Sequence, residues 1–453
     1  MLNLEVENLE EILDKLEAAL DQKDLETAAV LLKTLRVADQ AELVNELDEE
    51  DTLALLPHLP PADSANILEE LDDEYAAELI AELPTETVVR IVDEMEPDEA
   101  ADLLNDLEPE QARAVLAALD DPDEIRPLLL HRDESAGGLM TSDFLALRRR
   151  MTAAEALQAI REWKPESETI HYLYVVDAQR TLCGMVSLRQ LIVADPKSTL
   201  MDIMEKEVIS VVAGTDQEEV ARLMSRYDLL TLPVVDGDNH LIGVITIDDV
   251  VDVLEEEASE DIQRLGGAEP LDRPYLDTPA FTMARKRIGW LLLLFITGSL
   301  TASVMELFAE ETRAVIELGF FIPLLIGTGG NAGSQTTSTI IRALAVGDID
   351  TKDALYALWH ELRSSLLLGL GMGIIAYLRV MLWGGISSNI AMTVAISILA
   401  VIIWANSLGA LLPLLAAKLK IDPTVVSGPA MSTLVDATGL FIYFTIARWI
   451  IGL

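Results

Sequence analysis

Cysteine is almost missing from this chain of 453 residues, in which Cys183 stands alone. A single cysteine cannot form a disulfide within the chain, which suits the reducing cytosol, and Cys183 is best interpreted as a small buried apolar residue. The N-terminus, MLNLEVENLEEILDKLEAAL, is acidic and lacks the apolar core of a secretory signal. No cleavable signal peptide is therefore expected.

Basic residues are scarce as well: 32 Lys and Arg stand against 77 Asp and Glu, for a formal net charge of −45. This balance excludes nucleic-acid binding, which requires clustered Lys and Arg to neutralise phosphates. The excess is uneven, with 40 acids against 8 bases in residues 1–140 but 10 against 11 in residues 285–453. An acidic soluble part therefore precedes a membrane part, and cations are its natural partners.

Catalytic signatures are the third absence. No nucleophile stands in a pattern with a general base, and no zinc-ligand spacing occurs; His58 and His131 are isolated. Both histidines are interpreted as surface or hydrogen-bonded residues. The chain is not expected to be an enzyme.

Residues 1–135 indicate an acidic α-helical superhelix. Residues 1–50 read as two amphipathic helices, followed by a 12-residue repeat whose units end on Leu71, Leu83, Met95, Leu107 and Leu119. Each unit opens with Pro, Asp or Glu, which suits the first turn of a helix, and closes on apolar residues. Short stacked helices with acidic outer surfaces are predicted.

Residues 136–252 contain a duplication. LYVVDAQRTLCGMVSLRQLI (173–192) is echoed 59 residues later by LPVVDGDNHLIGVITIDDVV (232–251), each half giving a helix, two strands and a closing helix. This α/β pair resembles tandem CBS domains, which often bind adenosine nucleotides at a Ser/Thr-x-x-Asp sequence. The second copy has Asp249 there, a possible nucleotide contact, whereas Gln190 replaces the acid in the first. The resemblance thus makes ATP a possible ligand and implies weak binding or none.

Residues 253–284 are predicted to form an amphipathic connecting helix. Its apolar stripe, which starts inside the duplication, is Val250, Leu254, Ala258, Ile262 and Leu265, and acids crowd the other side. Two interpretations stay open for these acids. They could form a solvated face, as charge runs usually do, or couple the regulatory pair to the membrane.

Residues 285–453 are predicted to form a transmembrane domain of five helices, at about 287–306, 318–343, 362–384, 389–417 and 424–447. Lys and Arg cluster before the first span, after the second and between the last two. Placing these clusters inside predicts a multi-pass protein of the cytoplasmic membrane, with a cytosolic N-terminus and CBS pair and an external C-terminus.

The fifth span carries Asp436 near its middle, where a carboxylate costs roughly 2.5–3.5 kcal/mol on insertion scales. Ser432, Asp436 and Gly439 fall at i, i+4 and i+7, which places them on one small, polar face of a helix. That face is expected to line a path. The alternative is that Asp436 only bonds to a neighbouring helix.

The second span, FFIPLLIGTGGNAGSQTTSTIIRAL (320–344), interrupts apolar sequence with four glycines, amides and hydroxyls. Irregular or polar backbone at membrane depth is tolerated only where it is buried or lines water. Asn331, Ser334, Gln335 and Ser338 fall on one helical face. Packed against the Asp436 face, they would make a polar seam.

Four features in this order resemble the MgtE family of magnesium channels: the acidic N-domain, the CBS pair, PLLIGTGGNAGSQ (323–335) and PxxxxxxDxxG (429–439). The resemblance implies a homodimeric Mg²⁺-selective channel in a lipid bilayer, with its path on the two-fold axis between the second and fifth spans. Asp436 would bind the ion there, and Ser432 and Gly439 would line the pore. The family often has Asn where Gly428 stands, which removes a side-chain oxygen at the pore entrance.

The same resemblance implies Mg²⁺-sensing sites on the cytosolic side, so that Mg²⁺ would be both substrate and regulator. The matching residues are Asp98, Asp102, Asp216, Glu218, Asp228, Asp249, Asp252, Glu257, Glu260, Asp261 and Asp422. Crowded carboxylates repel unless divalent ions bridge them, so high Mg²⁺ should favour a compact closed state. The alternatives are a CBS-regulated transporter of another divalent cation or solute, and a membrane-tethered Mg²⁺ sensor without transport.

Overall fold

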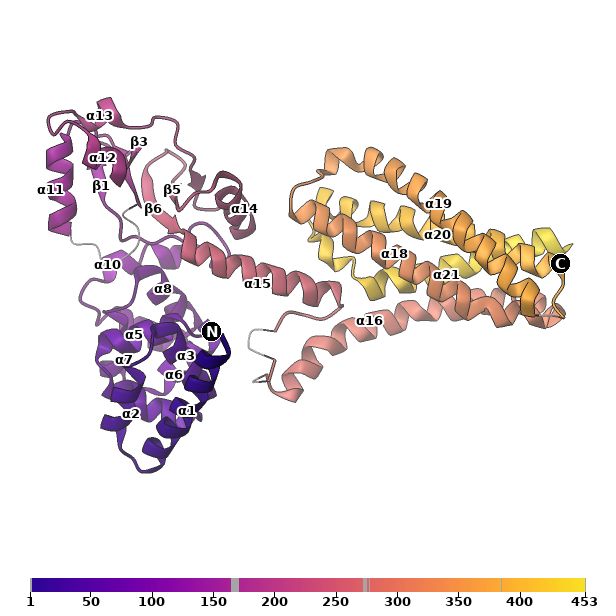
Figure 1. Cartoon of the computed structure of the whole chain (residues 1–453), viewed down its shortest axis with the longest axis horizontal. Coiled ribbons are helices and arrows are strands. Elements are labelled where there is room, and N and C mark those ends of the chain that lie inside the picture. Colours follow the sequence, from indigo (N-terminus) through magenta and orange to yellow (C-terminus); the bar gives the residue numbers. More distant parts are fainter. Residues whose placement is uncertain (1, 164–170, 272–274, 277, 384, 453) are drawn as a thin grey trace. The chain divides into compact units, whose positions relative to one another are not determined.

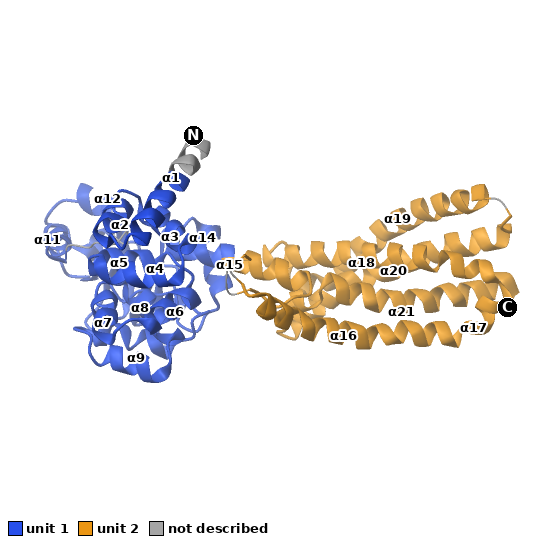
Figure 2. Cartoon of the chain, turned by 90° about the horizontal axis from the view of Figure 1, so that it is seen from below, with its two compact units in different colours: residues 1–255 blue, residues 256–453 orange. Residues whose placement is uncertain are grey.

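The computed structural model describes residues 2–163, 171–271, 275–276, 278–383 and 385–452. The chain forms two compact units, residues 1–255 and 256–453 (Figure 2). Figure 1 labels their helices and strands. The first unit holds the N-domain and the CBS pair, and the second is almost entirely helical, as the sequence predicts.

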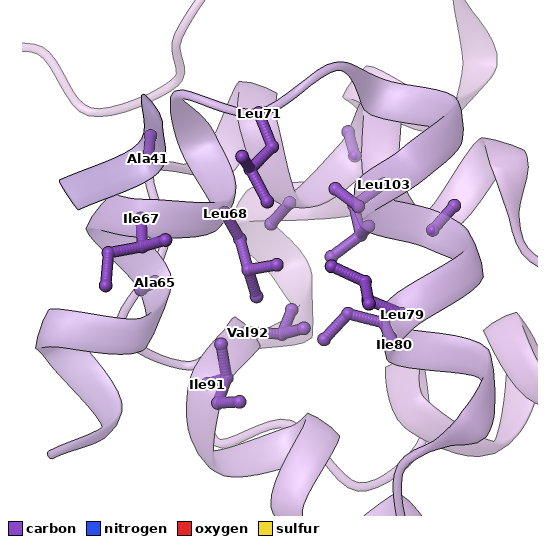
Figure 3. Close-up of a cluster of buried hydrophobic side chains, with 14 of the residues drawn as sticks. Ala41, Ala65, Ile67, Leu68, Leu71, Leu79, Ile80, Ile91, Val92 and Leu103 are labelled. Atoms are coloured by element: carbon purple, nitrogen blue, oxygen red, sulfur yellow. The ribbon is translucent and has the colours of Figure 1, made fainter. Parts of the chain in front are cut away.

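The N-domain is a stack of short helices: α1 (Leu2–Asp21), α2 (Leu25–Leu32), α3 (Val37–Glu46), α4 (Glu49–Leu55), α5 (Pro61–Glu69), α6 (Asp73–Glu82), α7 (Thr85–Val92), α8 (Pro97–Asp106), α9 (Pro109–Leu116) and α10 (Pro122–Ile125). Each helix packs against the helix two places further along the chain. The odd-numbered helices α3, α5, α7 and α9 therefore form one row, and the even-numbered helices α2, α4, α6 and α8 form another. Leu68, Leu79 and Val92 meet in the core (Figure 3). The predicted repeat of stacked helices is confirmed.

The N-terminal 50 residues contain three full helices, α1 to α3, rather than the two expected. One of the two breaks between them lies at Lys23, whose φ of 58° is left-handed. Asp24 then starts α2 by accepting a hydrogen bond from the Thr27 amide at 3.1 Å. Sequence periodicity missed this break because leucines continue at helical spacing on both sides of it.

The CBS pair is built from two similar halves. The first has β1 (Ala146–Arg148), α11 (Ala153–Trp163), β2 (Tyr172–Val176), β3 (Leu182–Ser187), α12 (Leu188–Val193) and α13 (Leu200–Ile203); the second has β4 (Val211–Val212), α14 (Gln217–Tyr227), β5 (Thr231–Val235), β6 (Leu241–Thr246) and α15 (Ile247–Leu265). In each sheet the first two strands are parallel and the last two antiparallel. Tyr172 pairs with Ser187 as Thr231 pairs with Thr246, which confirms the duplication down to strand register.

Helix α15 differs from the connecting helix that the sequence suggested. It runs from Ile247 to Leu265, so the closing CBS helix and the connecting helix are one element, and residues 280–284 belong to the next helix, α16 (Ala280–Leu307). The chain turns at Gly267, whose φ of +75° favours glycine. Leu254 and Ile262 are 45% and 70% exposed, so most of the apolar stripe stays uncovered in the single chain.

The second unit contains α16 (Ala280–Leu307), α17 (Ala309–Ala314), α18 (Ile322–Ala345), α19 (Ala354–Trp383), α20 (Ser388–Lys418) and α21 (Gly428–Ala447). Within the described residues, four helices are long and apolar enough to cross a membrane: α16, α19 with its preceding turn, α20, and α21 with its C-terminal extension. Helix α18 has the length, at 24 residues, but its amides and hydroxyls make it too polar. Helix α20 packs against α18, α19 and α21.

Helix α18 is continuous through its four glycines, as the helical spacing of its polar residues predicts. The glycines permit close helix packing. A Cβ on Gly329 would lie 2.6 Å from a Val401 methyl of α20 and 2.8 Å from a Val435 methyl of α21. Gly330 approaches Ser432 of α21 in the same way. The polar span therefore forms a regular helix whose glycine face is buried by its two neighbours, α20 and α21.

This packing predicts that Gly329→Ala destabilises the membrane unit by about 1–3 kcal/mol, the usual cost of overpacking. Gly327 on the same helix is the matched control, because no atom lies within 4 Å of its Cβ position. Thermal unfolding in detergent should show a lower midpoint for Gly329→Ala than for Gly327→Ala. Equal midpoints would show that the contact relaxes without cost.

Candidate ion path and cytosolic acidic cluster

Asp436 lies in the middle of α21, which begins at Gly428 after the buried cap Ser427. The Ser427 hydroxyl accepts a hydrogen bond from the Ala430 amide at 3.3 Å and fixes where the helix starts. Asp436 itself is half-buried, and its Oδ1 is covered without a hydrogen-bond partner among the described residues. The alternative interpretation, in which Asp436 only bonds to a neighbouring helix, is therefore not supported by any contact among the described residues.

The neighbours of Asp436 on α21 divide between two helices. Ser432 faces α18, where its hydroxyl fills the space left by Gly330. Gly439 is buried towards α20, and its Cβ position is 3.4 Å from a Val401 methyl. Ser432 thus lies on the side of the proposed seam, whereas Gly439 allows close packing with α20.

The polar face of α18 is largely uncovered in the single chain. Asn331, Gln335 and Ser338 are exposed, while the Ser334 hydroxyl donates to the Gly428 carbonyl at 3.2 Å. The predicted contact between the polar face and α21 is therefore made at one end by Ser334. An exposed polar face on an apolar helical bundle requires water or another protein surface at membrane depth.

Asp422, just before α21, is tied to the connecting helix. Arg264 Nη1 lies 2.6 Å from Asp422 Oδ2, and Arg264 also pairs with Glu260 one turn earlier. Partial burial, followed by the nearby Asp422 and Glu257 carboxylates, raises the pKa of Asp261. Arg264 was not among the predicted site residues, although it is the lone base after a run of acids on α15.

A second acidic cluster lies in the first unit, where α8 meets the start of α15. Asp98 is 6% exposed; its burial and then the carboxylates of Asp249 and Glu96 hold its pKa well above the usual range. Burial and the nearby Asp73 raise the pKa of Asp102 to about 8. The structure therefore brings together three predicted sensing residues: Asp98, Asp102 and Asp249.

Three members of this cluster were missed by sequence reasoning. Burial and neighbouring carboxylates raise the pKa of Glu99 to about 10, of Glu96 to about 7 and of Asp73 to about 6. Their positions in the first turns of α6 and α8 made them look like ordinary helix-starting acids. Only the packing of α6 against α8, with Asp249 of α15 nearby, reveals that they are crowded.

The remaining predicted sensing residues are more dispersed. Asp216 caps the start of α14, where its carboxylate accepts from the Glu218 amide at 3.1 Å, and Asp228 caps the end with a φ of 52°. Opposite ends of an 11-residue helix cannot share one ion. Asp252 is exposed on α15. Among the described residues, no three His, Cys, Asp or Glu side chains are arranged to hold a metal together.

The raised pKa values predict that the stability of the first unit depends on pH when a chelator has removed all divalent ions. Glu99, Asp102 and Glu96 have higher pKa values in the compact unit than when exposed, so the compact state binds more protons. Their contribution to the stability of the compact state should therefore be fully present below about pH 4 and be lost as pH rises through about 7 to 10. Amide hydrogen exchange of α8 in the full chain, corrected for intrinsic rates, should be slower at about pH 6 than at about pH 8.

Glu99→Gln should flatten that dependence, whereas the exposed Glu110→Gln on α9 should leave it unchanged. Identical protection of α8 at both pH values in the wild-type chain would contradict the crowding that these pKa shifts describe.

Comparison with known proteins identifies the family of this chain. Family models match residues 35–132 as the MgtE intracellular N domain, 136–197 and 200–256 as CBS domains, and 322–446 as the MgtE divalent cation transporter. The magnesium transporter MgtE of Thermus thermophilus is 43% identical over 72% of each chain. The chain belongs to the MgtE family. The magnesium transporter MgtE of Enterococcus faecalis, at 37% identity, also covers 72% of each chain.

Solved structures match the soluble part of this MgtE family member. The cytosolic domain of the Mg²⁺ channel MgtE in complex with ATP is 39% identical, with a TM-score of 0.51, over 53% of this chain and 99% of that one. The soluble part of a magnesium transporter is 35% identical, with a TM-score of 0.50, over 55% and 99%. The helical N-domain and CBS pair of the family are thus both present.

Proposed function

We propose that this chain conducts Mg²⁺ across the cytoplasmic membrane and is regulated by Mg²⁺ on its cytosolic side. The observation that carries the proposal is Asp436, a half-buried carboxylate in the middle of an apolar helix with an unpartnered oxygen. An intramembrane acid of this kind marks an ion pathway by default. The magnesium transporters of the family support Mg²⁺ as the ion.

The chemistry of the path suits a hydrated ion. Mg²⁺ dehydrates reluctantly and is usually held by one or two carboxylates around retained waters. One chain offers Asp436, with Ser432 one turn away and exposed amides on α18. Two copies related by a two-fold axis would close the uncovered polar face of α18 and provide two carboxylates. A homodimer is therefore part of the proposal.

Regulation is assigned to the two acidic clusters. In the first unit, Asp98, Asp102 and Asp249 are crowded against each other; in the second, Asp261 stands beside Asp422. Bound Mg²⁺ would stabilise both arrangements and thereby favour a closed state. The Lys and Arg distribution supports a cytosolic N-terminus and CBS pair with an external C-terminus.

Flux measurements test the proposal directly. Full-length protein in proteoliposomes loaded with a Mg²⁺ indicator should admit Mg²⁺ down its gradient, and protein-free liposomes should not. Parallel assays with Co²⁺ and Mn²⁺ indicators test the alternative of another divalent cation. An absence of flux for all three ions, in correctly folded protein, would favour a membrane-tethered sensor.

ATP is proposed as a weak ligand at most. The side chain of Gln190 is already hydrogen-bonded within the CBS pair. Its Oε1 accepts from the Ser187 amide at 2.8 Å, and its Nε2 donates to the Glu205 carboxylate at 2.9 Å. Asp249 likewise caps its helix by accepting from Thr246. The two positions are thus equivalent caps, but Gln190 lacks the negative charge that would bind ribose hydroxyls.

Calorimetric titration of ATP into the full chain should therefore give no saturable binding at micromolar concentrations. Gln190→Asp should strengthen binding by about tenfold, the effect of one charge-assisted hydrogen bond. The exposed turn variant Gln179→Asp is the matched control. Micromolar binding by the wild-type chain would show that other residues replace the missing acid.

A further inference from the structure

A set of oxygen atoms lies inside the membrane unit, away from Asp436, where α18, α19 and α20 meet. Thr336 Oγ1 of α18 is 3.3 Å from Glu361 Oε2 of α19. The next residue, Thr337, is fully buried, and its hydroxyl has no hydrogen-bond partner among the described residues. Helix α21, which carries Asp436, contributes no residue to this set.

Helix α20 closes the set at Gly409. A Cβ at Gly409 would lie 3.1 Å from both Thr337 Oγ1 and Thr336 Cβ, and 2.7 Å from the Gly333 carbonyl oxygen. Asn406, one turn earlier on α20, is 2% exposed, and its Oδ1 is also covered and unpartnered. The Gly333 Cβ position is 3.5 Å from the Ala405 carbonyl, so Asn406 is level with the same part of α18.

The unpartnered atoms have a common chemistry. The Asn406 Oδ1 can only accept, the Glu361 carboxylate can accept from both oxygens, and the Thr337 hydroxyl has lone pairs. Leaving a buried oxygen without a partner destabilises the folded protein, and two such atoms on neighbouring helices call for an electropositive ligand. Within the described chain Glu361 has no Lys, Arg or His partner, only the Thr336 hydroxyl.

We propose that Thr336, Thr337, Glu361 and Asn406 form a monovalent cation site within each subunit, with Na⁺ as the ligand. The charge decides between ions: one carboxylate with neutral oxygens balances a single positive charge, whereas a divalent ion would leave an excess charge at low dielectric. The backbones of Gly333 and Gly409 are nearly in contact, which suits a dehydrated ion. Mg²⁺, in contrast, keeps its waters.

This site goes beyond Mg²⁺ transport and does not depend on Asp436. A bound ion would join α19 to α18, the helix that carries the exposed polar face. Its location gives Na⁺ a means of stabilising the bundle from within the subunit.

Equilibrium binding of ²²Na⁺ to the purified full-length protein, with choline as the replacing cation, tests the proposal. The wild-type chain should bind about one Na⁺ per subunit, and millimolar Mg²⁺ should not displace it. Glu361→Gln and Thr337→Val should each weaken binding by about tenfold or more, since each loses an ion ligand. Thr393→Val is the matched control, because Thr393 is equally buried but its hydroxyl donates to Asn389 at 2.8 Å.

Asp436→Asn should leave Na⁺ binding intact, which separates this site from the Mg²⁺ path. Thr337→Val should fold at least as well as wild type in choline, because it removes an unpartnered buried hydroxyl. The proposal is overturned if the wild-type chain binds no Na⁺, if Mg²⁺ displaces it, or if both site variants bind it as tightly as wild type. Loss of Na⁺ binding in Asp436→Asn would also overturn it.

Discussion

Asp436→Asn is expected to reduce Mg²⁺ flux into proteoliposomes by about 100-fold or more, while the protein still assembles. Two unit charges about 4 Å apart interact by roughly 4 kcal/mol at an effective dielectric of 20, and about 2.7 kcal/mol already corresponds to 100-fold. The substitution removes that charge but keeps the size of the side chain. Because Asp436 Oδ1 has no partner among the described residues, no internal bond is lost.

The matched control is Asp348→Asn, which neutralises an exposed acid in the turn after α18. It removes the same charge without touching the middle of a span, so its flux should equal that of wild type. Size-exclusion chromatography establishes that both variants assemble alike. Undiminished flux in Asp436→Asn would sink the assignment of α21 to the ion path.

The residues proposed to line the ion path could be picked out from the sequence because their signals are local. A carboxylate in an apolar stretch, and amides repeated at helical spacing, can be recognised without knowing any contact. Asp436, Ser432 and the polar face of α18 were found in this way, and α18 and α21 are helices as expected. What the local pattern could not tell is that the α18 glycines serve packing against Val401 and Val435.

The acidic clusters show the opposite case. Glu99, Glu96 and Asp73 look like the acids that start many other helices in the N-domain. Their raised pKa values follow from the packing of α6 and α8 against each other and near α15, which are contacts between segments far apart in the sequence. Glu361 was missed for a related reason, because it lies just before the predicted third span and its partner Thr336 is on another helix.

The connecting helix illustrates how amphipathicity can mislead. Its apolar stripe suggested a buried face, yet Leu254 and Ile262 are exposed, and the polar side carries the contact to Asp422 through Arg264. A hydrophobic stripe only shows that some apolar surface should cover it. In a protein proposed to dimerise, that surface can belong to a second copy.

The acids of α15 should decide how Mg²⁺ closes the channel. Asp249 stands in the crowded cluster with Asp98, while Asp261 has Asp422 and Glu257 as neighbours. Without cations these groups repel by up to roughly 4 kcal/mol per close pair, which opposes the compact state. When Mg²⁺ binds the compact state more tightly than the open state, the net electrostatic free energy favours the compact state instead. Shifting an equilibrium from 1:99 to 99:1 takes roughly 5.5 kcal/mol of differential binding, which several sites can share.

Combined neutralisation by Asp249→Asn, Glu257→Gln and Asp261→Asn has two opposed effects. It relieves repulsion in the ion-free compact state, and it removes ligands that Mg²⁺ would bridge. At millimolar Mg²⁺ the loss of ligands should dominate, because an ion attracts each carboxylate more strongly than two carboxylates repel. The triple variant should therefore stay open at Mg²⁺ concentrations that close the wild-type channel, with a closing midpoint raised by about tenfold or more.

Patch recording from giant liposomes across a cytosolic Mg²⁺ titration measures that midpoint. The control is a triple variant of exposed N-domain acids, Glu49→Gln, Glu82→Gln and Glu110→Gln, which changes the net charge equally. Its midpoint should match that of wild type, because screening at physiological salt removes most of the effect of distant surface charge. If the midpoint of the α15 variant is also unshifted, these acids are only a solvated face and do not carry the regulation by Mg²⁺.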